Sequence, residues 1–500
     1  MTVFASALSG FETVFEPTNL LLCLVGVTVG MLIGVLPGLG PAATIAILLP
    51  ATYGLEPASA IILLAGIFYG AQYGGTVTSV LLNLPGEASS VVTAFDGHQM
   101  AKQGRAGSAL GIAAVGSFIG GTIGIVGLSL IAPVVAGFAL DFGPPEYAVL
   151  AVLGILLVST LGSGSAVKAI LAASIGLLLA TVGTDPVQGQ DRFTFGTDQL
   201  ADGIDFVVIA MGVFGIGELL YSLEGMRRAN VTDPPEVGKA YPSRDDLRAS
   251  RAPIARGSVI GFVLGILPGG GATMSSLVAY SVEKRIAKEP QRFGKGAVEG
   301  VASPETANNA AATSSFIPLL TLGIPANGTM AVMFGALLLQ GITPGPQLIT
   351  DHPDVFWGVI DSMYIGNLLL LAMSIPLIGL FVRVLTVRPS ILAPLTVLIT
   401  LLGVYSIRNS VFDMQLVIAL GALGYLMKKL GLEPGPLVLA FVLGGLLEKS
   451  FRQSMRIFDG DLTGFVQRPI SGSLLAALFL LVIVAPTVTA IRRPRGRNTR

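Results

Sequence analysis

The chain is a succession of apolar runs separated by short polar stretches, and most runs approach the length that a helix needs to cross a bilayer, about 20 residues. In the first half the runs lie at 57–82, 108–138, 145–161, 166–183 and 205–223, and in the second half at 306–342, 357–385, 390–407, 411–427 and 471–490. The stretch 435–448 is too short to be placed as a spanning helix. This pattern predicts an all-α polytopic membrane protein.

Two glycine-proline segments, Gly34–Gly40 and Gly265–Gly271, interrupt apolar sequence and lie 231 positions apart. A break in a helix within a membrane leaves backbone groups unpaired, and this is tolerated where the loosened backbone faces protein or lines a cavity. Transporters place their substrate and ion sites at such broken helices. The pair therefore predicts the binding site of a transporter.

The arms of the second segment, 257–267 and 272–283, are each too short to cross the membrane, and basic loops flank both. This arrangement predicts a re-entrant hairpin that enters and leaves on the cytoplasmic side, with Pro268–Gly271 at its tip. The first segment has no basic flank, and its first arm covers 19–36. We expect that hairpin to open on the opposite face.

Basic residues mark the expected cytoplasmic side, because cytoplasmic loops carry an excess of Lys and Arg. Seven lie between Arg227 and Arg256, five between Lys284 and Lys295, and five arginines lie in the tail 492–500. The loops near 185–205 and 343–354 are acidic and nearly free of Lys and Arg, so they are expected on the other side. The basic C-terminal tail is predicted to be cytoplasmic.

A second break follows each hairpin, at Leu81–Glu87 and at Leu319–Pro325. The loop after the first break is basic and the loop after the second is acidic, which indicates two repeats of inverted topology. The expected units are a first transmembrane repeat at 1–225, a basic cytoplasmic linker at 226–256 and a second transmembrane repeat at 257–430. Residues 431–500 supply C-terminal membrane segments and the tail.

The chemistry of these breaks suits an anion together with a cation. Amides at the start of a half-helix favour a carboxylate, and carbonyls at the end of a half-helix suit Na⁺. The expected substrate- and cation-binding residues are Pro37, Gly38, Gly40, Thr44, Thr78, Ser79, Asn83, Pro85 and Gly86 in the first repeat. In the second repeat they are Gly269, Gly270, Gly271, Thr273, Asn308, Asn309, Thr321, Gly323 and Pro325.

Ionisable residues within apolar sequence are few. Glu87 and Glu305 adjoin the breaks and could face a water-filled path, although an interfacial loop carboxylate is an equal alternative for Glu87. Lys168, Glu218 and Asp361 lie near predicted span ends, where we expect them to reach the interface or to cap helices.

Composition narrows the class further. The chain is 52% hydrophobic and 12% charged, whereas soluble proteins average about 25% charged residues. This composition predicts a lipid bilayer as surroundings. The 30 basic and 30 acidic residues give zero net charge, which predicts no nucleic-acid partner. The single Cys23 excludes an intrachain disulfide, and the spacing of the two histidines predicts no metal site.

Four motifs together carry a family resemblance. They are G-x-x-x-G-x-L-P-G-L-G from Gly30, Y-G-G-T-V-T-S-V-L-L-N-L-P-G from Tyr73, D-G-H-Q-M-A-K-Q-G from Asp96 and P-E-T-A-N-N-A-A from Pro304. The chain resembles the TctA family, the large membrane subunit of tripartite tricarboxylate transporters, over almost its whole length. His98 and Thr306 stand where that family often has Tyr and Ser.

The resemblance implies a permease of the bacterial inner membrane rather than an enzyme. It implies a small four-helix membrane subunit and a periplasmic solute-binding protein as partners, and uptake of citrate or a related carboxylate by alternating access. No cofactor is expected beyond a coupling ion, Na⁺ or H⁺, with Na⁺ the first candidate. A passive anion channel, an intramembrane hydrolase and a membrane scaffold subunit are the alternatives.

Overall fold

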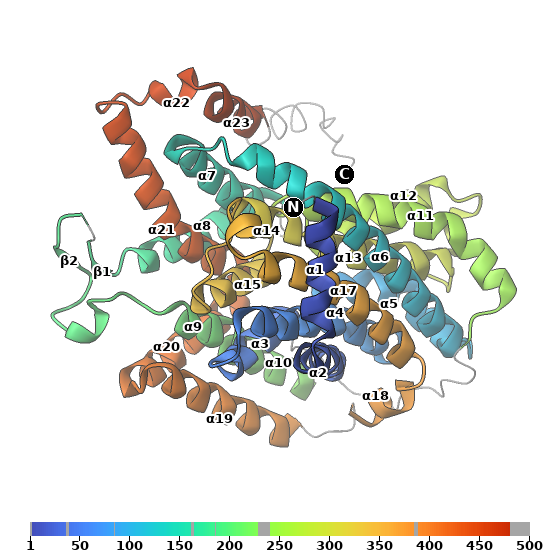
Figure 1. Cartoon of the computed structure of the whole chain (residues 1–500). Coiled ribbons are helices and arrows are strands. Elements are labelled where there is room, and N and C mark those ends of the chain that lie inside the picture. Colours follow the sequence, from blue (N-terminus) through green and yellow to red (C-terminus); the bar gives the residue numbers. More distant parts are fainter. Residues whose placement is uncertain are drawn as a thin grey trace, which may run out of the picture.

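The computed structural model describes residues 3–36, 40–84, 86–161, 165–185, 187–228, 241–384 and 389–480. These residues form a bundle of helices with one short β-ribbon, β1 (Gly183–Thr184) and β2 (Asp191–Arg192), projecting at one end (Figure 1). The helices of the first half are α1 (Val3–Phe15), α2 (Pro17–Gly34), α3 (Pro41–Leu48), η1 (Leu49–Thr52), α4 (Pro57–Leu82), η2 (Ala88–Ser90), α5 (Val91–Lys102), α6 (Ala106–Ala139), α7 (Pro144–Leu161), α8 (Ala166–Ala180), η3 (Asp198–Leu200), α9 (Phe206–Ala210), the π-helical η4 (Met211–Ile216) and α10 (Gly217–Arg228).

The second half begins with α11 (Arg244–Ile266), so the end of the expected linker is already helical, because Ser243 and Asp246 form a capping box at its start. It continues with α12 (Gly271–Ile286), η5 (Pro290–Arg292), α13 (Glu299–Ser314), α14 (Phe316–Leu322), α15 (Gly328–Leu339), α16 (Leu348–Asp351), α17 (Pro353–Ser374), α18 (Ile378–Val384), α19 (Pro389–Arg408), α20 (Val411–Lys429), α21 (Pro434–Ile457), α22 (Gly464–Gln467) and α23 (Pro469–Phe479).

The two glycine-proline segments occupy matching places in the packing. Helix α2 lies parallel to α4, since Gly26, Gly30 and Gly34 face the carbonyls of Leu63, Ile67 and Ala71 in turn. Helix α11 lies parallel to α13 in the same way, with Gly257, Gly261 and Gly265 against Ser303, Ala307 and Ala311. Two parallel helices require the chain between them to run back, so α2–α3 and α11–α12 are each a helical hairpin. Small residues allow this close approach of the backbones.

The breaks at Leu81–Glu87 and Leu319–Pro325 also share one backbone geometry. Helix α4 ends at Asn83 and α14 ends at Gly323, both in the left-handed conformation, with φ of 57° and 67°. The next amide then bonds six residues back, Leu84 N to Thr78 O and Ile324 N to Pro318 O. These bonds lie 240 positions apart, so the sequence resemblance of the breaks is matched by equivalent local geometry.

The following helices also start alike. The Glu87 carboxylate accepts the backbone N–H of Ser90 at the start of η2, and Asn327 Oδ1 accepts that of Met330 at the start of α15. Each break touches the tip of the hairpin in its own half. Gly86 lies against the carbonyl of Gly34, and Gly269 N donates to Ala326 O at 2.8 Å.

Each half packs one long helix against the other half. The long helix α6 of the first half lies on α13 of the second, where Gly116, Gly120 and Gly124 face Thr306 and Thr313. The long helix α17 of the second half lies on α4 of the first, where Gly366 contacts Tyr69. The sequences Ile119-Gly120 and Ile365-Gly366 therefore hold similar places, each against the other half.

Among the described residues, seven helices are long and apolar enough to cross a membrane. The expected run 306–342 is divided among α13, α14 and α15, since the second break lies inside it. The stretch 435–448, judged too short, is the apolar part of the 24-residue α21. The inverted orientation of the repeats and the re-entrant nature of the hairpins remain predictions.

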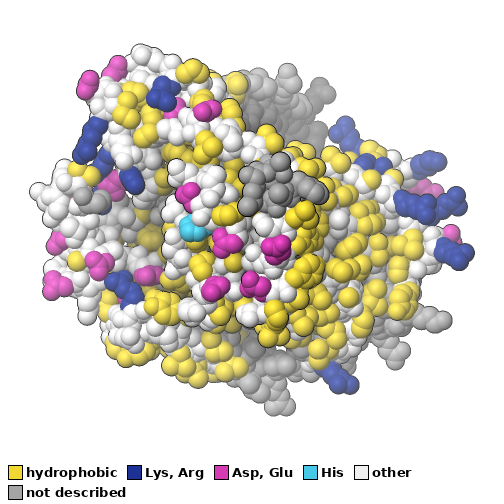
Figure 2. Space-filling model, in the orientation of Figure 1, with side chains coloured by type: hydrophobic (Ala, Val, Ile, Leu, Met, Phe, Trp, Pro, Cys, Tyr) yellow, Lys and Arg dark blue, Asp and Glu magenta, His cyan; other side chains and the backbone are white. Residues whose placement is uncertain are grey.

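Charged side chains on one face lie on both sides of a hydrophobic zone (Figure 2). Figure 2 shows Lys and Arg at the right edge, where Figure 1 places α11 and α12, and a broad hydrophobic zone between them and acidic side chains nearer the centre. The end of α21 lies with the acidic loop at 185–192, because Arg452 pairs with Asp185 at 2.7 Å and Arg192 pairs with Glu448 at 2.8 Å. The hydrogen bonds from Arg452 hold the pKa of Asp185 well below its ordinary value.

Candidate functional site

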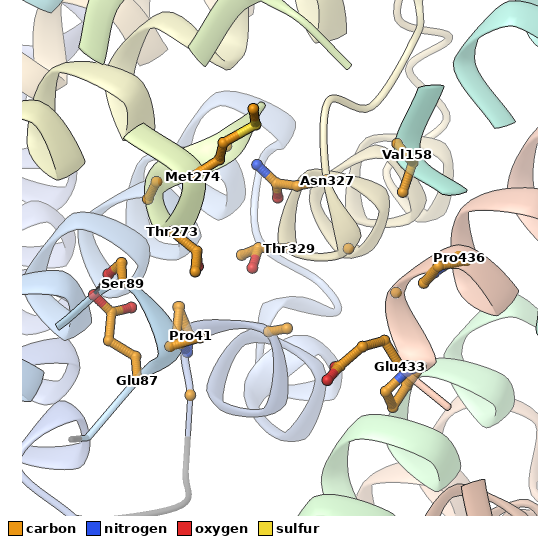
Figure 3. A pocket seen from close by; sticks show the side chains of 18 of the residues that line it. Pro41, Glu87, Ser89, Val158, Thr273, Met274, Asn327, Thr329, Glu433 and Pro436 are labelled. Atoms are coloured by element: carbon orange, nitrogen blue, oxygen red, sulfur yellow. Dashed lines mark hydrogen bonds between the residues drawn. The ribbon is translucent and has the colours of Figure 1, made fainter. Parts of the chain in front are cut away.

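A cavity of about 380 Å³ lies between the two hairpin tips and the helix starts that adjoin the breaks. Its wall includes the start of α3, the start of α12, Gly86–Ser89 from the end of the first break to η2, and Asn327–Thr329 at the start of α15. Segments more than 200 positions apart thus face one space, as Figure 3 shows for Pro41, Glu87, Thr273, Asn327 and Thr329. The volume falls within the range of small-molecule sites, about 300–1,000 Å³.

Two helix starts in this wall have no side-chain cap. Gly40 precedes α3 and Gly270 precedes α12, and neither position supplies a capping hydrogen bond. The first amides of a helix have no partner within it, so the N–H groups of Ala42, Ala43, Ala272 and Thr273 are left for a ligand. Each helix start also carries a partial positive charge of about half a unit, which favours an anion.

The first break adds a carboxylate held by neutral groups. Ser89 Oγ donates to Glu87, and Gln72 from α4 places its terminal amide 2.9 Å from Glu87 Oε2. Gly75 makes room for this side chain, since a Cβ there would lie 2.8 Å from Glu87 Cγ. The Glu87 carboxylate therefore lies in the cavity wall with hydrogen-bond partners but without a cation beside it among the described residues.

The cavity also reaches a group of charged side chains from later helices. Lys168 of α8 donates to Leu430 O at 2.5 Å, and Lys428 of α20 lies 3.2 Å from Glu218 and 3.6 Å from Glu433. All four side chains belong to the wall. Figure 3 shows Glu433 directed toward the interior from the side opposite Glu87. The site thus offers two ammonium groups to an anion.

Six of the predicted residues line the cavity, and the others that the structure describes do not. Gly40, Gly86, Gly269, Gly270, Gly271 and Thr273 line the cavity. Thr44, Thr78, Ser79 and Thr321 are buried and donate their hydroxyls to helix carbonyls three or four residues earlier. Asn83 is exposed at its cap, and Gly323 and Pro325 form the second break without lining the cavity. Pro37, Gly38 and Pro85 lie outside the described residues.

Asn308 and Asn309 belong to a buried polar junction rather than to the cavity wall. Glu305 accepts hydrogen bonds from Thr76 of α4 at 2.7 Å and from Thr93 of α5, and Asn308 Nδ2 lies 3.5 Å from the same carboxylate. Asn309 Nδ2 donates to Ser117 of α6 at 2.8 Å. The dense polar run 304–312 therefore ties α13 to three helices of the first half.

Sequence reasoning missed several residues of the wall. Lys168 donates to Leu430 O at the end of α20, as expected of a side chain that caps a helix, and it also lines the cavity with Glu218. Asp361 was expected near a span end and is instead buried within α17. Lys428 and Glu433 gave no local signal, because only the fold brings the α20–α21 connection to the hairpin tips. Where the structure describes the chain, no cluster of three His, Cys, Asp or Glu side chains could hold a metal ion.

Comparison with known proteins identifies the family. Residues 20–439 match the family described as the tripartite tricarboxylate transporter TctA family. The chain belongs to this family. TctA proteins are the large membrane subunits of tripartite transporters, so membership makes this chain a transporter subunit and a membrane protein.

Two relatives come from Agrobacterium vitis, and neither name states an activity. The "Uncharacterized 52.8 kDa protein in TAR-I ttuC' 3'region" is 50% identical over 499 residues, covering 99% of both chains. The "Uncharacterized protein in TAR-II ttuC' 3'region" is 53% identical over 237 residues, covering 47% of this TctA chain and 98% of the relative. No solved structure matches the chain.

Proposed function

We propose that this TctA protein is the permease of a binding-protein-dependent secondary transporter in the bacterial inner membrane. It imports a tricarboxylate or a related carboxylate by alternating access, coupled to a cation gradient, with Na⁺ as the first candidate ion. A small four-helix membrane subunit and a periplasmic solute-binding protein complete the system. The observation that carries the proposal is the cavity lined by both hairpin tips and by the helix starts that adjoin the breaks.

The wall of the cavity suits a carboxylate with more than one charged group. The amides at the starts of α3 and α12 can hold one carboxylate. Lys168 and Lys428 supply charge for another, and Lys168 has no carboxylate partner among the described residues. Hydrogen bonds to charged groups contribute about 1.5–3 kcal/mol each, so these contacts can select an anion over a neutral solute.

The charges of the wall also favour a co-transported cation. Glu87, Glu218 and Glu433 face the cavity together with Lys168 and Lys428, which gives one excess negative charge when all are ionised. An incoming carboxylate adds further negative charge at low dielectric, where such repulsion is strong. A cation that enters with the substrate offsets this repulsion, and an ion gradient can then drive accumulation.

Uptake by proteoliposomes tests the proposal. The permease, the small subunit and the solute-binding protein are reconstituted, and labelled citrate and other di- and tricarboxylates are offered under an imposed Na⁺ or H⁺ gradient without ATP. We expect accumulation that requires the binding protein and a cation gradient. Accumulation without any gradient would contradict the coupling, and large uncoupled currents would favour a passive channel.

Lys168 allows a test of the site itself. We expect Lys168→Ala to raise KM about tenfold or more, because a charged hydrogen bond of about 1.5–3 kcal/mol is lost. Lys168→Arg should keep most of the affinity, since it keeps the charge. Lys288→Ala changes an exposed lysine after α12 and should leave KM unchanged. An unaltered KM for Lys168→Ala would remove this residue from the substrate site.

A further inference from the structure

Glu87 and Gln72 form a pair that can satisfy two charge states of the carboxyl group. The amide of Gln72 lies 2.9 Å from Glu87 Oε2, on the wall of the cavity. With its nitrogen toward Glu87, Gln72 donates to the carboxylate. After a half-turn of the amide its oxygen faces Glu87 and accepts from the protonated acid. With the nitrogen toward Glu87, both ends of the Gln72 amide meet hydrogen-bond partners, whereas with the oxygen toward Glu87 the nitrogen faces only donors. The exchange needs rotation of the amide and no backbone movement.

The matching position in the second half cannot do this. Glu87 and Asn327 lie 240 positions apart, at equivalent places beside the two corresponding breaks, and each caps the helix that comes after it. Asn327 is a neutral amide, so only the first half carries an ionisable group at this place. A cap needs an acceptor alone, and Asn, Asp, Ser and Thr are the usual choices. Helix capping alone therefore does not explain why position 87 carries a carboxyl group.

The surroundings place Glu87 where a change of charge matters. The neutral side chains of Gln72, Ser89 and Ser90 surround it on α4 and η2, and α12 contributes neutral residues to the adjoining wall. Glu305 of α13 is close enough to repel its charge. Across the cavity lie Lys168 and Lys428 with their neighbours Glu218 and Glu433. Neutral Glu87 would remove the one excess negative charge of the wall.

We propose that Glu87 is the proton-binding group of this transporter: it is protonated while a carboxylate occupies the cavity, and it releases that proton on the other side. The inference rests on the proposed function and adds a proton to its cycle. A hydronium ion on the side where substrate enters donates the proton: one of its O–H bonds breaks as an O–H bond forms on Glu87. On release the Glu87 O–H bond breaks and a water molecule on the other side accepts the proton. A Na⁺ ion bound elsewhere in the site is compatible with this role.

Proton uptake by the reconstituted three-component system tests this role. A pH-sensitive dye in the lumen reports protons carried with each substrate, and labelled substrate reports accumulation and exchange. Glu87→Gln mimics the protonated state permanently. We expect it to carry fewer protons per substrate than wild type and to lose accumulation driven by a proton gradient. Exchange of substrate across the membrane should continue and become independent of pH.

Two further variants serve as controls. Glu87→Asp retains an ionisable group and should carry as many protons per substrate as wild type. Glu56→Gln changes an exposed glutamate that makes no capping hydrogen bond at the start of α4, and it should behave as wild type. If Glu87→Gln does not assemble, infrared spectra provide the readout. Addition of substrate should then produce a protonated-carboxyl band in wild type that shifts in Glu87→Asp.

The outcomes separate this inference from the function on which it rests. Proton transport by Glu87→Gln equal to wild type would overturn the role of Glu87 and leave cation-coupled import standing. Wild-type accumulation under Na⁺ alone, with no proton carried, would do the same. Failure of every gradient to drive accumulation by wild type would instead contradict the proposed function.

Discussion

At the residue scale, Asp96 shows how a buried carboxylate holds the two halves together. Its Oδ1 accepts the N–H groups of Gly294, Gly296 and Ala297 at 2.8–2.9 Å, and its Oδ2 accepts the hydroxyl of Tyr280 at 2.9 Å. Asp96 itself lies on α5 and is fully buried. One side chain of the first half therefore fixes the connection between α12 and α13, and through it the second hairpin.

We expect Asp96→Ala to lower the free energy of unfolding by about 2–4 kcal/mol, because several buried donors lose a charged acceptor. Asp96→Asn should cost less, since its oxygen still accepts. The measurement is thermal unfolding of the purified complex in detergent. Asp198→Asn, at an exposed position in η3, is the matched control. Equal midpoints for Asp96→Ala and the control would show that this carboxylate is dispensable.

The residues found from sequence are those whose backbone carries the signal. Gly40, Gly86 and Gly269–Gly271 line the cavity because a glycine-proline break both interrupts a helix and exposes its ends. Lys168 was expected only to reach the interface or to cap a helix, and Lys428, beside Lys429 at the end of an apolar run, looks like the end of a span. Their place beside the hairpin tips depends on which helices pack together, and no local pattern contains that information.

At the scale of elements, two glycine stripes set how closely each hairpin approaches its parallel partner. The stripes are Gly26, Gly30 and Gly34 of α2 and Gly257, Gly261 and Gly265 of α11. A Cβ at Gly30 would collide with the carbonyl oxygen of Ile67, and one at Gly261 with that of Ala307. Backbone oxygens cannot move aside as a flexible side chain can. The stripes therefore position the tips at the cavity, although they lie outside it.

We expect Gly30→Ala and Gly261→Ala to destabilise the protein by about 1–3 kcal/mol each, as overpacking does. Gly137→Ala is the matched control, because it lies in α6 with no atom within 4 Å of an added Cβ. Alanine is the better helix former there, so the control should be neutral or slightly stabilising. The measurement is thermal unfolding of each variant. A loss of stability for Gly137→Ala as large as for the other two would show that the stripes have no special role.

Most helices could be located from apolar runs, and the errors have physical causes. Helix α13 is polar in sequence yet buried, because its small and hydrogen-bonding side chains pack against α6, α11 and α4. Helix α21 looked short because it ends in Lys449, Arg452 and Arg456. Arg452 finds Asp185 and Glu448 as partners, so its charge does not end the helix where hydropathy falls.

At the scale of the whole molecule, charge placement predicts which ends of the bundle face the cytoplasm. The basic segments around α11 and α12 mark one end, and the acidic loop at 185–205 marks the other. The contacts of Arg452 and Arg192 place the end of α21 with the acidic loop, despite its three basic residues. A count of Lys and Arg alone would have assigned that end to the cytoplasm.

Labelling of single cysteines tests whether the end of α21 lies on the cytoplasmic side or on the side of the acidic loop. With Cys23 replaced by Ser, we introduce Gln188→Cys in the acidic loop, Lys288→Cys after α12 and Lys449→Cys near the end of α21, all at exposed positions. A membrane-impermeant thiol reagent added to intact cells should label positions 188 and 449, and should reach position 288 only after the membrane is opened. The ion pairs of Arg452 with Asp185 and Glu448 offset part of the positive charge at the end of α21, which lowers the usual cost of placing it outside. Labelling of position 449 together with 288 would mean that α21 lies the other way, and that its ion pairs with the 185–192 loop do not form in the membrane.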